Sequence, residues 1–206
     1  MRIPLPVAMR LPMYHQYITY MINTGCQWIS SNVIAKSLGL TPSTIRQDIK
    51  YLDKIESSSL GYSTKSFKKI LENVLGISAG ANIALVGAGS LGMALAHYRG
   101  FKDKGFEIKA MFDKKTNIVD QGIDGVPVYP LGRISEIIKK DRITIGIITT
   151  PAEVAQEVAD ILVNAGIKGI WNFAPINIQV PPNIALENVN LMPSLFSLAF
   201  KIKWNG

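Results

Sequence analysis

The chain has 206 residues, of which 48% are hydrophobic and 18% charged, and its mean hydropathy is +0.20. This composition is typical of a globular protein with one large or two small domains, and the chain is too short for most dehydrogenases with a separate substrate domain. The single cysteine, Cys26, excludes a disulfide framework and a cysteine-based zinc site, so we expect no metal.

Two segments bear on where the chain acts. Prolines and Arg10 interrupt the first 14 residues, so we expect no signal peptide and a cytoplasmic protein. Residues 77–98 carry no charged side chain over a length that could span a membrane. Glycines and Asn82 within this stretch argue against a span, and we expect no membrane association.

The net charge of +7 is concentrated in the first third of the chain. Residues 1–76 contain nine Lys and Arg against four Asp and Glu, whereas residues 77–206 contain 13 against 11. This asymmetry indicates a module that binds a polyanion, joined to a nearly neutral one. Scattered surface lysines produce the same asymmetry in proteins without such a partner.

The basic segment predicts a series of short helices, over residues 12–22, 32–38, 42–52 and 65–75. Ser30 and Ser31 offer an N-cap to the second helix, and Gly39 closes that helix in the left-handed conformation. Thr41 and Pro42 then open the third helix as its N-cap and first residue. Helix, glycine turn and helix together form the plan of a helix-turn-helix.

In a helix-turn-helix the second helix presents its outward face to the major groove of DNA. The candidate DNA-binding residues on this face are Ser43, Thr44, Arg46, Gln47, Lys50 and Tyr51. The segment that follows, residues 56–62, suits either a β-wing or a plain linker. Because helical hairpins with glycine turns also occur in proteins that bind no DNA, the spacing alone leaves both interpretations open.

A dinucleotide-binding pattern begins at residue 82. Residues 82–86 are an apolar run that suits a buried parallel strand, and a GxGxxG loop and a helix over 93–98 follow it. The first glycine permits the turn, the second lets a pyrophosphate approach the backbone, and the third lets helix and strand pack closely. The candidate cofactor-binding residues here are Gly87, Ala88, Gly89, Ser90, Leu91 and Gly92.

A carboxylate follows the next predicted strand. That strand, over residues 107–112, ends in Asp113, which lies 21 residues after Gly92. At this distance a carboxylate accepts hydrogen bonds from the adenosine ribose and repels a 2′-phosphate, which favours NAD over NADP. Lys114, also a candidate cofactor contact, weakens this preference slightly.

Strands and helices keep alternating, with strands predicted over 126–129, 143–149 and 167–172 and helices over 134–140 and 152–164. Repeated β–α units of this length predict an α/β fold with a parallel, doubly wound Rossmann sheet. Ligands of such sheets bind beyond the carboxyl ends of the strands. Further cofactor candidates at these ends are Thr149, Thr150, Pro151, Asn172, Phe173 and Ala174.

The remaining residues favour a regulatory protein over an enzyme. Neither His15 nor His97 lies in a recognisable catalytic arrangement, and no substrate domain follows the sheet. The chain continues with a strand predicted over 189–191 and an apolar helix over 193–203. Because this helix is apolar around most of its circumference, we expect a second copy of the chain to cover it.

Motifs in both halves of the chain carry a family resemblance. They include Arg10-Leu-Pro-Met-Tyr14, Arg46-Gln-Asp48, Val86-Gly-Ala-Gly-Ser-Leu-Gly92, His97-Tyr-Arg-Gly-Phe101, Asn172-Phe-Ala-Pro175 and Glu187-Asn-Val189. On these motifs the chain resembles the Rex family of NADH-sensing redox repressors over nearly its full length. The resemblance implies a homodimer with a winged helix-turn-helix domain over 1–76, a Rossmann domain over 77–191 and a C-terminal helix over 192–206 that is exchanged between subunits.

The resemblance also implies binding to palindromic operator DNA, and release of the DNA when NADH replaces NAD. It implies a switch in which Tyr98 lies near the nicotinamide and, with NAD bound, joins Arg10 and the other subunit's residue at the position of Asn190. The alternative is a dinucleotide- or CoA-binding subunit, regulatory or oxidoreductase-like, without a DNA role.

Three features depart from the family pattern. Residues 53–62 replace the basic, glycine-rich wing of the family and have lost most of its glycines and its arginine. Gln47 stands where the family carries a lysine or arginine, and Asn190 stands where it carries an aspartate. We therefore expect weaker, more salt-sensitive DNA binding and a weaker response to the NADH/NAD ratio.

Overall fold

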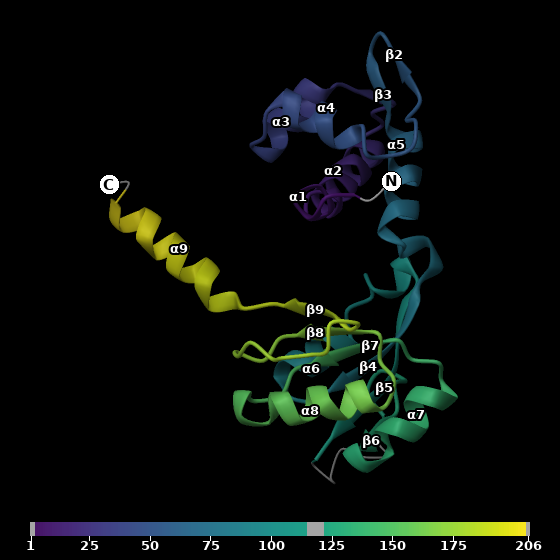
Figure 1. Ribbon diagram of the computed structural model, residues 1–206, viewed down its shortest axis with the longest axis vertical. Helices are drawn as coiled ribbons and strands as arrows, with labels where there is room; N and C mark the ends of the chain where they lie inside the picture. The colour runs from purple at the N-terminus through teal and green to yellow at the C-terminus, as the bar shows by residue number, and fades with distance from the viewer. Residues whose placement is uncertain (1–2, 115–121, 205–206) are drawn as a thin grey trace. The chain divides into compact units, whose positions relative to one another are not determined.

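The computed structural model describes residues 3–114 and 122–204, and the chain folds into two compact units, residues 1–79 and 80–206. The division follows a short 3₁₀ helix, η1 (Ile77–Ala79), just after the boundary expected at residue 76. Figure 1 shows the helices and strands of each unit, and each unit buries its own hydrophobic core.

The first unit is a winged helix-turn-helix. Its elements are α1 (Leu5–Ala8), α2 (Leu11–Asn23), β1 (Trp28–Ile29), α3 (Ser31–Leu38), α4 (Pro42–Ile49), β2 (Ser57–Ser58), β3 (Gly61–Ser63) and α5 (Thr64–Leu75). The three short strands form an antiparallel sheet in the order β1-β3-β2. Of the two structures considered for residues 56–62, the observed one is the hairpin of β2 and β3, which forms the wing.

Local hydrogen bonds explain where the helices of the helix-turn-helix begin. The Ser30 hydroxyl accepts a bond from the Val33 N–H at 3.3 Å, and the Thr41 hydroxyl accepts one from the Thr44 N–H at 3.2 Å. Both are the predicted N-caps. Gly39 has a φ of 66°, which is the left-handed conformation predicted between the two helices.

The third predicted helix is shorter than the expected range of 42–52. α4 ends at Ile49, because the N–H groups of Lys50, Tyr51 and Leu52 each bond to the carbonyl three residues earlier. Such bonds tighten the chain into a 3₁₀ turn. Lys50 and Tyr51 therefore belong to this turn rather than to the regular helix.

The core of the first unit lies where its four longer helices meet. Its fully buried side chains include Tyr14, Ile18, Ile34, Ile45, Phe67 and Leu71. α2 packs against α5, and the His15 Nε2 atom lies 3.3 Å from the Glu72 Oε1 atom between them. Burial alone would raise the pKa of Glu72, but hydrogen bonds from Lys68 and His15 outweigh it and lower that pKa.

The second unit is a Rossmann fold. Its elements are β4 (Ala81–Val86), α6 (Ser90–Ala96), η2 (Lys102–Lys104), β5 (Phe106–Asp113), β6 (Val128–Pro130), η3 (Leu131–Arg133), α7 (Ile134–Lys140), β7 (Ile145–Ile148), α8 (Ala152–Asn164), β8 (Gly169–Asn172), β9 (Ala185–Asn188) and α9 (Leu191–Trp204). The strands form one parallel sheet in the order β6-β5-β4-β7-β8-β9. The strand order reverses between β4 and β7, which is where such sheets bind ligands.

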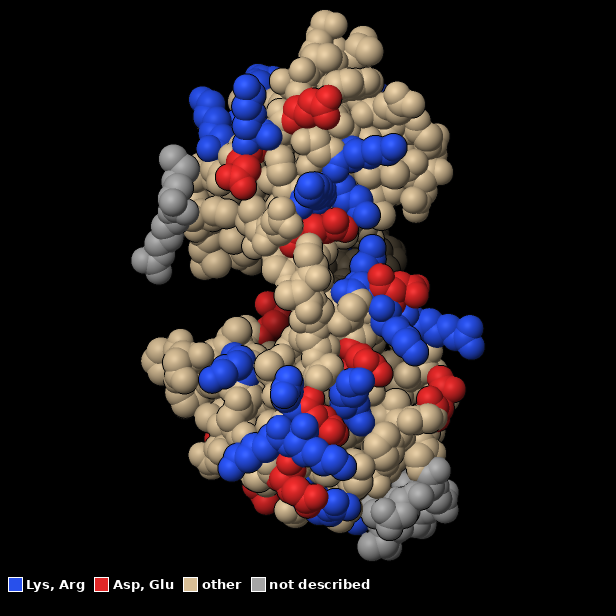
Figure 2. Space-filling view, turned by 90° about the vertical axis from the view of Figure 1, so that its right-hand side faces the viewer, with Lys and Arg blue, Asp and Glu red and all other residues tan. Residues whose placement is uncertain are grey.

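Helices cover both faces of this sheet (Figure 1). α7 and α8 pack on one face, against side chains such as Val86 and Phe112. α6 packs on the other face, against Leu85 and Met111. Since consecutive side chains of a strand point to opposite faces, the apolar run over residues 83–86 of β4 is explained by burial on both sides. On the face in view in Figure 2, positive and negative side chains are interspersed over this unit.

Three predicted elements of the second unit are displaced. The helix expected over 93–98 begins at Ser90 and ends at Ala96. β6 begins at Val128, because Ile123 and Val126 pair with each other in a tight turn. β9 covers residues 185–188 rather than 189–191, and Leu191 already begins α9.

α9 is apolar and buries none of its residues in this chain. Its exposed large apolar side chains are Leu191, Met192, Leu195, Phe196, Leu198, Phe200, Ile202 and Trp204. An apolar surface of this kind marks a contact with another molecule. Within residues 3–114 and 122–204, no helix is long and apolar enough to cross a membrane.

Candidate functional site

The three glycines of the GxGxxG loop differ in what surrounds them. Gly87 has a φ of 105°, and a Cβ atom there would lie 2.9 Å from the Thr149 backbone. A Cβ atom on Gly92 would overlap the carbonyl oxygen of Gly87. Gly89 is exposed, and a Cβ atom there would meet nothing within 4 Å. The first and third glycines thus serve the packing of the loop, and the second leaves its outer side open to a ligand.

Thr149 and Asp113 hold this loop from the ends of β7 and β5, the two strands that flank β4. The Thr149 hydroxyl lies 2.7 Å from the Gly87 carbonyl oxygen and 3.1 Å from that of Val86. The Asp113 Oδ2 atom accepts a hydrogen bond from the Ala88 N–H at 2.6 Å. The predicted site residues Thr149 and Asp113 therefore position the loop backbone, a role that their spacing in the sequence did not indicate.

A cavity of about 370 Å³ opens beside the loop, at the carboxyl ends of β4, β5 and β7. Its lining includes the predicted residues Gly87, Gly89, Asp113, Lys114, Thr149, Thr150 and Pro151. The other lining side chains, Val86, Phe112, Leu131, Val154 and Val158, are apolar and were not predicted as site residues. Leu131 follows β6, so the rule that ligands bind beyond strand ends could have indicated it.

The cavity suits a dinucleotide. Apolar walls with a few polar groups are typical of ligand sites, and the open side of Gly89 admits a pyrophosphate to the loop. Thr150 lines the cavity, and its hydroxyl is buried without a hydrogen-bond partner among the described residues. A buried hydroxyl of this kind is satisfied when a ligand supplies the missing partner.

Asn172 and Ala174 lie outside the cavity lining and are surrounded by other groups of the protein. The Asn172 amide is fully buried, and its Nδ2 atom donates to the Ile176 carbonyl oxygen at 2.7 Å and to the Asn188 Oδ1 atom at 2.8 Å. Its Oδ1 atom accepts a bond from the Ala174 N–H at 3.0 Å. The amide closes the turn after β8, and Ala174 lies in the core, so the structure does not bring these two side chains to the cavity.

Tyr98 and Phe173 belong to a row of aromatic rings outside the cavity lining. The ring centroids of Tyr98 and Phe101 are 4.9 Å apart, those of Phe101 and Trp171 5.9 Å, and those of Trp171 and Phe173 4.7 Å. A Cβ atom on Gly100 would lie 2.6 Å from the Tyr98 ring, so the ring can pack there only because residue 100 has no side chain. Tyr98 itself is 60% exposed.

The three residues of the expected switch are divided between the two units. Arg10 lies in the first unit, and Tyr98 and Asn190 lie in the second. Asn190 is exposed, and its Oδ1 atom accepts a hydrogen bond from the Met192 N–H at 3.1 Å, at the start of α9. The role of Asn190 in a switch stays a prediction.

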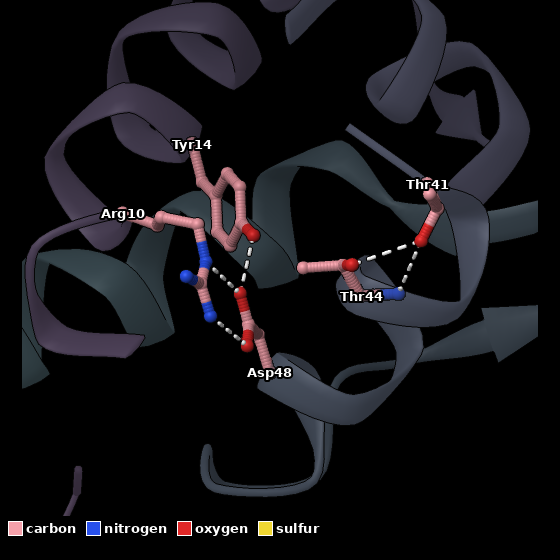
Figure 3. Close-up of polar contacts among 5 residues, drawn as sticks. All are labelled: Arg10, Tyr14, Thr41, Thr44 and Asp48. Carbon is pink, nitrogen blue, oxygen red and sulfur yellow. Dashed lines mark hydrogen bonds and ion pairs between the residues drawn. The ribbon is translucent and has the colours of Figure 1, made fainter. Parts of the chain in front are cut away.

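The predicted DNA-binding face of α4 is exposed. Ser43, Arg46, Gln47 and Lys50 are exposed, and Tyr51 is 37% exposed. Arg46 donates a hydrogen bond to the Ser31 hydroxyl of α3 at 3.2 Å, which holds its guanidinium beside the turn. The Thr44 hydroxyl lies 2.8 Å from the Thr41 hydroxyl, so Thr44 takes part in the N-cap (Figure 3).

The opposite face of α4 carries a buried carboxylate, the last residue of the Arg46-Gln-Asp48 motif, for which the sequence indicates no contact. Asp48 is 2% exposed, and both of its oxygens accept hydrogen bonds from the Arg10 guanidinium at 2.7 Å (Figure 3). The Tyr14 hydroxyl donates to the same carboxylate at 2.5 Å. We refer to Arg10, Tyr14 and Asp48 as the Asp48 cluster.

Charge and burial in the Asp48 cluster set its protonation. Burial alone would raise the pKa of Asp48, but the hydrogen bonds from Arg10 and Tyr14 outweigh it and hold that pKa below its usual value. Burial and the hydrogen bond to Asp48 raise the pKa of Tyr14, and the same carboxylate raises the pKa of Arg10. The cluster is a bidentate ion pair joined by a neutral phenol.

No group of His, Cys, Asp and Glu side chains suited to a metal ion occurs in the described ranges.

Comparison with known proteins gives two domain matches. The family model "CoA binding domain" matches residues 79–176, and the model "Putative DNA-binding protein N-terminus" matches residues 2–49.

Full-length relatives are also found. Proteins named redox-sensing transcriptional repressor Rex, from Desulfitobacterium hafniense and Clostridioides difficile, are 37% and 39% identical to this chain, over 98% of it and 96% of each relative. The crystal structure of RSP in complex with β-NAD+ and operator DNA matches with a TM-score of 0.90 at 35% identity, covering 98% of this chain and 93% of that one. A structure of RSP with β-NADH matches with a TM-score of 0.89 at 35% identity, covering 98% and 95%. The chain therefore belongs to the Rex family of redox-sensing transcriptional repressors.

Proposed function

We propose that this chain is a homodimeric transcriptional repressor that binds palindromic operator DNA with NAD bound and releases the DNA when NADH replaces NAD. The observation that carries the proposal is the joining, in one chain, of a cavity at a GxGxxG loop and a helix-turn-helix with an exposed polar face. It is a regulator rather than an enzyme, in keeping with the names of its relatives, and acts in the cytoplasm with the DNA it controls.

NAD(H) is the proposed ligand of the cavity. Gly89, Ser90 and Leu91 are exposed on the outer side of the loop, where the pyrophosphate would approach. Asp113 would accept hydrogen bonds from the adenosine ribose, and the apolar walls at Leu131 and Val154 would hold the adenine. The relative RSP has been solved with both β-NAD+ and β-NADH.

α4 is the proposed DNA-reading element, because the exposed side chains of this helix and of the turn after it include two cations, Arg46 and Lys50, and the Gln47 amide. Such groups contact phosphates and base edges. Arg46 is the best-placed direct contact, since Ser31 already holds its guanidinium. The remaining proposed contacts are Ser43, Gln47, Lys50 and Tyr51. A palindromic operator requires two such units related by a two-fold axis, and the uncovered apolar helix α9 supports exchange between two copies.

The test is a titration of the full-length protein with a palindromic duplex selected from a randomised palindromic library, in NAD, in NADH and without nucleotide. We expect affinity to be higher in NAD than in NADH. Sedimentation at micromolar concentration should give a dimer, and removal of residues 193–206 should give monomer or aggregate. A monomeric full-length protein, or a protein that selects no duplex, would refute the proposal.

A second candidate is the CoA-binding subunit without a DNA role. It is favoured by the match of residues 79–176 to the CoA binding domain model and by the absence of Lys and Arg from residues 55–62. Fluorescence titration with NADH, NADPH and CoA separates the two candidates. The repressor should bind NADH more tightly than NADPH, and Asp113→Asn, which retains an acceptor for the Ala88 N–H, should narrow that difference.

A further inference from the structure

The Asp48 cluster lies on the side of α4 that faces away from the proposed DNA contacts. We infer that Asp48, through Arg10 and Tyr14, is the positioning residue that sets the orientation of α4 for sequence-specific DNA contact, an inference that rests on the function proposed above. Arg10 precedes α2 and Tyr14 lies within it, whereas Asp48 lies in α4. The cluster therefore ties α2 to α4 (Figure 3).

The hydrogen bonds of the Asp48 cluster define the orientation of α4 as well as its distance from Arg10 and Tyr14. Two hydrogen bonds from Arg10 reach the two oxygens of one carboxylate, each at 2.7 Å, and Tyr14 supplies a third bond from another side. Bidentate pairs of this kind are geometrically specific, whereas apolar contacts are non-directional. Ile45, one turn earlier on the same face, is fully buried among apolar side chains. Ile45 therefore anchors α4 in the core, and the Asp48 cluster fixes its rotation and tilt.

The side chains that depend on the orientation of α4 are close to Asp48 in the sequence. Arg46 and Gln47 immediately precede Asp48 and project from the exposed side of the same helix. Hydrogen bonds to base edges require defined positions, whereas contacts to phosphates hold the protein on any sequence. A disturbed cluster should therefore lower the preference for the operator more than it lowers the affinity for DNA in general.

The experiment compares two duplexes with the full-length protein in saturating NAD. One is the palindromic duplex selected by the wild-type protein, and the other has the same base composition in scrambled order. Tyr14→Phe removes one hydroxyl while keeping the buried ring, and Arg10→Lys keeps the charge but loses the bidentate fork. Tyr17→Phe is the matched control, because Tyr17 lies on the same helix and is half-buried.

We expect Tyr14→Phe to lower the ratio of operator to scrambled affinity by about tenfold, Arg10→Lys to lower it further, and Tyr17→Phe to leave it unchanged. NADH affinity should be unchanged in Tyr14→Phe and Tyr17→Phe. If either folded variant keeps the wild-type ratio, or loses affinity for both duplexes by the same factor, the inference is wrong. If one variant does not fold, the other still decides. A wild-type protein that does not distinguish the two duplexes would refute the proposed function and this inference with it.

Discussion

At the scale of single residues, the second glycine of the loop offers the most direct test of the cofactor site. Gly89→Val should abolish NADH binding, because the new side chain fills the open space that the pyrophosphate would enter. It should not unfold the protein, since nothing lies within 4 Å of the added Cβ atom. Fluorescence titration and thermal unfolding measure the two effects. Gly132→Val is the matched control, because Gly132 is equally open but lies outside the cavity lining.

Residues with local signals could be predicted from the sequence, and residues defined by distant contacts could not. The N-caps Ser30 and Thr41 act within three residues of the chain, so their pattern is visible in the sequence. Asp48 meets Arg10 across 38 positions of the chain, and only the folding of the first unit brings them together. Asn172 illustrates the reverse case, because its place at a strand end indicated a ligand while its hydrogen bonds close a turn.

The Asp48 ion pair should also govern stability in acid. Because the folded pKa of Asp48 lies below its unfolded value, the pair stabilises the protein above about pH 4 and the stabilisation is lost as the pH falls through the folded pKa. Asp48→Asn should lower the free energy of unfolding by about 3–5 kcal/mol near pH 7, because it leaves the Arg10 charge unpaired beside a buried amide. Urea denaturation at pH 7 and pH 3.5 measures both effects. The difference in the free energy of unfolding between wild type and Asp48→Asn should be smaller at pH 3.5 than at pH 7. A difference that is the same at both pH values would contradict the lowered pKa of Asp48.

At the scale of elements, helices with a strongly periodic apolar pattern are the ones whose ranges the sequence predicts correctly. α7 and α8 have the predicted ranges, 134–140 and 152–164, because each presents a clear apolar face to the sheet. β9 was misplaced because Leu186 is its only half-buried residue, so this edge strand lacks the alternation that identifies a strand. The wing could not be distinguished from a linker, because strands of two and three residues carry almost no pattern.

The wing allows a prediction about the DNA interface. Leu60, between β2 and β3, is 68% exposed, and no Lys or Arg lies within residues 55–62. If the wing lies against DNA, Leu60→Arg should add one phosphate contact per subunit, raise operator affinity and steepen the slope of log affinity against log salt by about 0.9 per subunit. Leu5→Arg adds the same charge at a residue of α1 that is 73% exposed. Equal effects of the two variants in salt titrations would show that the wing makes no special contact.

At the scale of the whole molecule, the expected switch couples nucleotide binding to DNA binding. The resemblance to the family implies that a carboxylate at the position of Asn190, contributed by the other subunit, pairs with Arg10 when NAD is bound. In this chain Asn190 is neutral, and the Arg10 guanidinium is already paired with Asp48. A neutral partner makes a hydrogen bond about half as strong as a charged one, so the NAD-bound, DNA-binding arrangement should be favoured only weakly over the NADH-bound one.

Asn190→Asp should therefore strengthen the response to the NADH/NAD ratio. The new carboxylate can still accept the Met192 N–H bond at the start of α9, so the fold should be kept. The ratio of operator affinities in saturating NAD and saturating NADH should widen by up to about 30-fold, and by less where Asp48 competes for Arg10. Asn188→Asp is the control, because it adds the same charge two residues earlier and retains the acceptor for Asn172. An equal widening in both variants would reveal a general charge effect, and no widening in Asn190→Asp would mean that Arg10 does not exchange its partner when the nucleotide changes.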